Sequence, residues 1–95
     1  MDALSDDNSR ILTIKNKRGL HARASAKFVT LMAEYDAKIT VSKDGTSVCG
    51  TSIMGLMMLA AAIGDQIKIE GEGAQKDKAL DAIEALIDNK FGEDC

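Results

Sequence analysis

The residue best suited to chemistry in this chain is His21, its only histidine, which stands in the segment Gly19-Leu20-His21-Ala22-Arg23. An imidazole nitrogen can accept a phosphoryl group or act as a general base. Arg23 can hold a phosphate by bidentate hydrogen bonds, a geometry that lysine does not offer. Gly19 permits the turn that lifts His21 clear of the preceding segment. These residue types predict an anion or phosphoryl site at His21.

The elements expected on either side place His21 at the start of a helix. Alternating apolar residues predict a strand over Arg10–Lys15, and helical spacing predicts an amphipathic helix over Ala22–Tyr35. The first backbone N–H groups of a helix lack partners within it, and they lie at the positive end of the helix dipole. A lone histidine at such a position is also commonly a helix cap, a surface residue or a core residue, so that alternative stays open.

The composition narrows the classes of protein. The chain has 95 residues, enough for one domain, and a net charge of −3. That charge and the scarcity of aromatic residues (Phe28, Tyr35 and Phe91) argue against a nucleic-acid partner. No apolar run suggests membrane insertion or a signal peptide, so we expect a cytoplasmic protein.

The two cysteines, Cys49 and Cys95, do not form a disulfide framework, and we expect both to be free thiols. His21 has no cysteine or carboxylate cluster near it in the sequence, so we expect no metal site.

The remaining segments predict the order βαββαβα. Residues 1–9 are polar and aperiodic, and we expect a disordered extension. Along the rest of the chain, the patterns predict strands over 38–43, 46–49 and 66–70 and helices over 53–61 and 75–90. Asp44-Gly45 predicts a tight hairpin between the second and third strands. Three helices on one face of a four-stranded sheet would bury every apolar face.

The buried stripe of the first helix is predicted from its apolar spacing. Ala22, Ala26, Val29 and Ala33 fall four, three and four residues apart, with Phe28 and Met32 widening the stripe.

Ser52 begins a second segment of interest. Serine is a favoured N-cap, which would explain it without any regulation. The residues that follow it, however, are almost all apolar, which is more than one helix face can bury. We expect Met54 and Met57 to be partly exposed beside His21, on a surface whose flexible methionines suit several partners.

Both segments resemble motifs of one family. Gly19-Leu20-His21-Ala22-Arg23 is similar to the active-site motif of the histidine-containing phosphocarrier proteins (HPr) of the bacterial phosphotransferase system. Ser52-Ile53-Met54-Gly55-Leu56-Met57 is similar to the regulatory serine segment of that family. The resemblance implies an α+β open-faced β-sandwich with a mostly antiparallel sheet and a single phosphocarrier domain over residues 10–95.

The resemblance also implies a mechanism. Phospho-enzyme I would donate a phosphoryl group to Nδ1 of His21, which would pass it to an enzyme IIA domain. Arg23 would stabilise the phosphate, and backbone N–H groups would bind it, namely those of Ala22, Arg23 and Ala24. Partners would dock on Ala22, Lys27, Met54 and Met57. An HPr kinase/phosphorylase would act on Ser52. Such a carrier is a substrate of enzymes rather than an enzyme, needs no cofactor, and is most simply a monomer.

Two positions depart from the family pattern. Ala24 stands where the family usually has proline, which restores an N–H and frees φ. Gly50-Thr51 precedes Ser52 where many relatives carry a lysine. Alternatives remain open: a regulatory binding module controlled through Ser52, including the nitrogen-related branch, and a hydrolase using His21, which lacks a carboxylate partner close in sequence.

Overall fold

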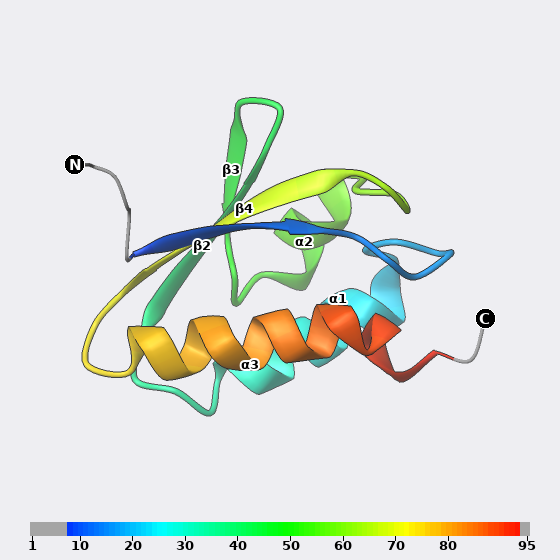
Figure 1. Cartoon of the computed structure of the whole chain (residues 1–95). Coiled ribbons are helices and arrows are strands. Elements are labelled where there is room, and N and C mark those ends of the chain that lie inside the picture. The colour runs from blue at the N-terminus through cyan, green and yellow to red at the C-terminus, as the bar shows by residue number, and fades with distance from the viewer. Residues whose placement is uncertain (1–7, 94–95) are drawn as a thin grey trace.

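The computed structural model describes residues 8–93. Its elements follow the predicted order: β1 (Ser9–Thr13), α1 (Ala22–Met32), β2 (Lys38–Lys43), β3 (Thr46–Cys49), α2 (Ile53–Met58), β4 (Gln66–Glu72), α3 (Lys76–Asp88) and a final 3₁₀ turn, η1 (Lys90–Gly92). The helices lie together on one side of the sheet, so the predicted open-faced sandwich is confirmed (Figure 1). Within the described residues, no helix has the length and apolar character needed to cross a bilayer.

The sheet is antiparallel throughout, in the order β1-β4-β2-β3. Val41 of β2 lies at its centre, opposite Ile69 of β4 and Val48 of β3. The predicted hairpin is present, and both of its turn residues have positive φ, 51° at Asp44 and 86° at Gly45. Two consecutive residues of that kind match the twist of the flanking strands, which accounts for the aspartate–glycine pair.

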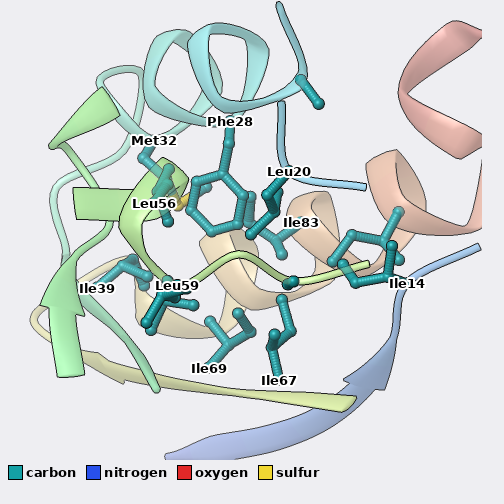
Figure 2. Packing of buried hydrophobic residues seen from close by; sticks show 14 of the residues in the cluster. Ile14, Leu20, Phe28, Met32, Ile39, Leu56, Leu59, Ile67, Ile69 and Ile83 are labelled. Atoms are coloured by element: carbon teal, nitrogen blue, oxygen red, sulfur yellow. The ribbon is translucent and has the colours of Figure 1, made fainter. Parts of the chain in front are cut away.

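The core lies between the sheet and the helices, with Phe28 at its centre. Figure 2 shows the Phe28 ring between Leu20 and Leu56, above the isoleucines of the sheet. The opposite face of the sheet carries polar side chains and the exposed Ile11, as its alternating pattern predicted. The core therefore uses only one face of the sheet, and α1 and α2 pack against each other above it.

The predicted buried stripe of α1 is confirmed at Phe28 and Met32 but wrong at its alanines. The buried residues of this helix are Ala24, Ser25, Phe28 and Met32. Ala22 and Ala33 are exposed, while Ala26 and Val29 are half-buried. Alanine buries little area on either face of a helix, so the large Phe28 and Met32 side chains, one turn apart, decide how the helix turns toward the sheet.

Several predicted boundaries also shift. α1 ends at Met32 rather than Tyr35, and α2 ends at Met58, shortly before Ala60 takes a positive φ of 53°. β1 begins at Ser9, inside the segment predicted as a disordered extension, because Ser9 pairs with Glu70. Residues 1–7 of that extension lie outside the described residues.

The turn before His21 is held against the segment that follows α2. Gly19 has a φ of 62°, and the next residue, Leu20, donates its N–H to the Ala61 carbonyl over 3.0 Å. A Cβ on Gly19 would overlap that same carbonyl oxygen. The early end of α2 therefore supplies the acceptor that fixes the loop leading to His21.

We expect Gly19→Ala to lower the free energy of unfolding by about 3 kcal/mol, through both the left-handed backbone and the overlap with Ala61. Gly45→Ala is the matched control, since Gly45 also has a positive φ but no atom lies within 4 Å of an added Cβ. Gly45→Ala should lower the free energy of unfolding by only about 1 kcal/mol. Urea unfolding measures the free energy of unfolding of both variants. Equal decreases in the two would contradict a destabilising overlap with the Ala61 carbonyl.

Candidate functional site

His21 is the N-cap residue of α1, as predicted. Its backbone is extended, with φ −75° and ψ −178°, and its carbonyl accepts the Ser25 N–H over 2.9 Å. The first-turn N–H groups of Ala22, Arg23 and Ala24 therefore have no helical acceptor. The His21 side chain is 19% exposed. This arrangement places a partly accessible imidazole beside a set of aligned donors at the positive end of an eleven-residue helix.

Two buried polar side chains hold the loop before α1. Asn16 donates its amide to the Gly19 carbonyl over 2.9 Å, and Ser25 donates its hydroxyl to the Leu20 carbonyl over 3.1 Å. Both side chains are fully buried. Since buried carbonyls need partners, these bonds make the loop conformation part of the core rather than a surface turn.

The imidazole has a carboxylate partner that the sequence analysis missed. Nε2 of His21 lies 2.6 Å from Oε2 of Glu93, a residue 72 positions later in the chain. The other oxygen, Oε1, accepts the Asn16 amide over 3.2 Å. His21 has no carboxylate partner close in the sequence, as stated, but the fold brings one to it from 72 positions away.

Glu93 is an ionised partner. The hydrogen bond with His21 lowers the pKa of the Glu93 carboxyl below its ordinary value of about 4.5, assisted by the Asn16 bond and by the charge of Arg18. Partial burial opposes this shift without cancelling it. A carboxylate only accepts hydrogen bonds, so Nε2 of His21 must carry the proton between the two groups.

An unusual backbone brings Glu93 to His21. Lys90, Phe91 and Gly92 all have positive φ, at 56°, 55° and 76°. The Phe91 side chain is buried in the core, and its carbonyl accepts Nζ of Lys27 over 2.6 Å. Burial of the ring offsets the cost of the left-handed backbone, which turns the chain back toward α1. Figure 1 shows this segment at the same end of the molecule as the start of α1.

The other residues predicted around His21 differ in exposure. Arg23 and Ala22 are exposed, whereas Ala24 is fully buried against the core. Arg23 also lines an open cavity of about 400 Å³ between α1 and α3, together with Lys27 and Leu86. Lys27 was predicted as a docking residue, but its ammonium already bonds within the chain.

Ser52 is the N-cap of α2, and its Oγ accepts the Gly55 N–H over 3.0 Å. The expected exposure of the following methionines is confirmed, with Met54 69% and Met57 40% exposed. Met58 and Ile63 are exposed as well, at 76% and 53%, and the sequence analysis missed both as surface residues. For Met58, the excess of apolar residues over what one helix face can bury was the available signal, whereas Ile63 lies in the turn after α2 and had none. We call Ile53, Met54, Met57, Met58 and Ile63 the α2 surface.

The fold and the site together define a class of protein. An open-faced sandwich whose first helix begins at a histidine, with first-turn N–H groups beside it and an arginine two residues later, has the architecture of small phosphocarrier domains. The class rests on the site as well as on the fold, since a fold alone does not specify function.

Comparisons with known proteins agree and are more specific. The family model described as "PTS HPr component phosphorylation site" matches residues 8–89. Phosphocarrier protein HPr of Cupriavidus necator is 49% identical over 88% of this chain and 94% of its own. Phosphocarrier protein NPr of Shewanella violacea is 46% identical over 88% and 92%. A crystal structure of HPr-C-His from Thermoanaerobacter tengcongensis superposes with a TM-score of 0.87, at 40% identity over 92% and 98%. The chain belongs to the HPr family of phosphocarriers of the bacterial phosphotransferase system.

The lowered pKa of Glu93 predicts how stability depends on pH. A carboxylate with a depressed folded-state pKa stabilises the protein above its ordinary pKa, and this contribution disappears as the pH falls through the folded value. We expect wild type to be more stable than Glu93→Gln at pH values above the ordinary carboxyl pKa of about 4.5, with the difference shrinking as the pH falls below it. Urea unfolding at several pH values measures this.

The control is the same substitution in a His21→Ala background. The bond to His21 is the largest cause of the shift, so the pH-dependent difference should be smaller there. A stability difference that stays constant as the pH falls from above to well below the ordinary carboxyl pKa would contradict the assignment of Glu93.

Proposed function

We propose that His21 accepts a phosphoryl group from phospho-enzyme I and passes it to an enzyme IIA domain. The observation that carries the proposal is the position of the imidazole, partly exposed at the N-terminus of α1 beside first-turn N–H groups that lack helical acceptors. The protein acts as a cytoplasmic carrier, is itself a substrate of phosphotransferase enzymes, and turns nothing over alone. A small carrier that exchanges partners needs only one copy of this site, so it works as a monomer.

The transfer uses Nδ1 of His21, because Nε2 faces Glu93. The Nδ1 lone pair attacks phosphorus as the bond to the donor breaks, and the same group leaves again to the next acceptor. N–H groups of the first turn bind the phosphate oxygens, and the Arg23 side chain neutralises charge during transfer. Ala24 has an N–H that the proline usual in the family lacks, but the residue is fully buried, so the N–H groups of Ala22 and Arg23 are the ones that meet the phosphate oxygens.

Partners dock on the α2 surface and on neighbouring parts of α1. Five large apolar side chains are exposed there, on and after one short helix. Exposed apolar patches on monomeric proteins commonly mark sites that bind a partner. Methionine adapts to different partner surfaces, which suits a carrier that binds both a donor and an acceptor. Ala22 and Lys27 would extend this contact along α1.

Ser52 provides the regulatory site of the proposal. Its hydroxyl caps α2 immediately before the α2 surface. Phosphorylation by an HPr kinase/phosphorylase would add about two negative charges beside apolar contacts, and desolvating those charges would weaken docking. The same surface supports a second candidate function, a regulatory module that binds other proteins under the control of Ser52. Relatives named HPr and NPr are both similar to this chain, so the nitrogen-related branch belongs to that second candidate.

We expect incubation with phosphoenolpyruvate and a bacterial enzyme I to add one acid-labile phosphoryl group to the wild-type chain and none to His21→Ala. Intact-mass spectrometry measures the product. Arg23→Ala should accept the group about ten- to a hundredfold more slowly, because a charged hydrogen-bond donor to the phosphate is lost. Lys38→Ala, an exposed cation at the start of β2, is the control and should transfer at the wild-type rate. Phosphorylation of His21→Ala would refute the proposed acceptor.

We expect Ser52→Asp to accept the phosphoryl group at least about tenfold more slowly than wild type, since its charge opposes docking. Aspartate is also a good N-cap, so this variant should keep the stability of α2. Ser52→Ala reverses the two effects: it loses about 1 kcal/mol of stability with the cap but keeps the transfer rate. Single-turnover kinetics and thermal unfolding separate them. A wild-type rate for Ser52→Asp would exclude regulation through this residue.

A further inference from the structure

We propose that Glu93 is a positioning residue of the phosphoryl site, which holds the proton of His21 on Nε2 and so keeps Nδ1 free to react. This inference rests on the proposed phosphorylation of His21. Glu93 does not touch the phosphoryl group and acts through the imidazole ring. The residue comes from the segment after α3, which the sequence motif around His21 does not include.

The geometry selects one form of the ring. A neutral imidazole carries its single proton on either Nδ1 or Nε2. Oε2 of Glu93 lies 2.6 Å from Nε2. An ionised carboxylate has no proton to donate, so at that distance it accepts a hydrogen bond from a nitrogen that carries one. The proton is therefore on Nε2, and the unprotonated nitrogen is Nδ1, the nucleophile that phosphoryl transfer requires.

The carboxylate is itself fixed from two sides. Oε1 accepts the amide of the fully buried Asn16, which also bonds to the Gly19 carbonyl in the loop before His21. The Glu93 side chain is only 12% exposed. One buried amide thus sets the distance between the carboxylate and the loop that carries the imidazole.

The backbone of the segment supports a built arrangement rather than a chance contact. Three successive residues, Lys90 to Gly92, adopt left-handed φ values, two of them without being glycine. The buried Phe91 ring and its bond from Lys27 keep this conformation in place. Strained backbone of this kind persists where the surrounding structure determines it, commonly at functional sites.

The same contact would act during the reaction. When Nδ1 bonds to phosphorus and the donor bond breaks, the ring keeps its Nε2 proton and becomes a cationic phosphoimidazolium. The Glu93 carboxylate stabilises that positive charge, and the charge disappears when the phosphoryl group leaves for the next acceptor. No proton needs to enter or leave the site in either direction. The groups facing this contact are Asn16 and Arg18, the latter being the nearby cation.

The test is the ¹⁵N NMR spectrum of the His21 ring in the full chain, recorded at alkaline pH. We expect wild type to show the Nε2-protonated form almost alone. Glu93→Ala should show a mixture of the two forms and should accept the phosphoryl group from phospho-enzyme I about tenfold more slowly. Its phosphohistidine should also hydrolyse more slowly near neutral pH, because the cationic form that releases phosphate is less populated.

Asp88→Asn is the matched control. Like the Glu93 variant it removes one negative charge, but from the last residue of α3 and its surface pair with Lys15, 2.6 Å away, rather than from His21. It should keep the wild-type ring spectrum and transfer rate. Glu93→Gln keeps the size of the side chain and should show an intermediate ring spectrum, which separates the loss of charge from the loss of packing.

The outcomes distinguish the two proposals. If wild type is phosphorylated but Glu93→Ala keeps the wild-type ring spectrum and rate, the role of Glu93 is refuted while the phosphocarrier function stands. If wild type is not phosphorylated on His21, the carrier function is refuted, and the inference that rests on it is overturned as well, whatever the ring spectrum shows.

Discussion

The buried amide of Asn16 joins the three parts of the chain that make the site. It bonds to the Gly19 carbonyl of the loop after β1 and to the Glu93 carboxylate of the segment after α3, and the loop leads directly into α1. Its own Oδ1 is buried and has no hydrogen-bond partner within the described residues, a cost that a purely structural position would avoid. The amide is oriented so that its NH₂ group donates to both the Gly19 carbonyl and the Glu93 carboxylate, and these two groups position His21.

Around that amide, the protein gives up stability at several points. First-turn N–H groups of α1 lack helical acceptors, three successive residues near the C-terminal end have left-handed φ, and a charged carboxylate lies mostly out of water. Each of these costs free energy unless something binds or compensates it. They occur together beside the only histidine, while the sheet and core follow ordinary packing rules. Such local exceptions are where a functional site is expected.

The segment that carries the α2 surface divides its apolar residues between the core and the outside of the protein. Leu56 and Leu59 attach this segment to the core, while its other large apolar residues face outward. The helix is short and ends early, which frees Ala61 to accept the Leu20 N–H next to His21. One segment therefore both supports the phosphoryl site and offers the apolar contacts that we assign to partners.

The sequence by itself determined the elements, the fold class and the position of His21. Alternation defined β2 and β3 to the residue, the aspartate–glycine pair defined their hairpin, and Ser52 was identified as a cap, because these signals depend on neighbours along the chain. Tertiary structure decided which face of α1 is buried, how much of the α2 surface is exposed, and that Glu93 meets His21. Packing of Phe28 decides which face of α1 is buried, and packing of Phe91 turns the chain so that Glu93 meets His21. A contact between residues 72 positions apart leaves no periodic trace in a single sequence.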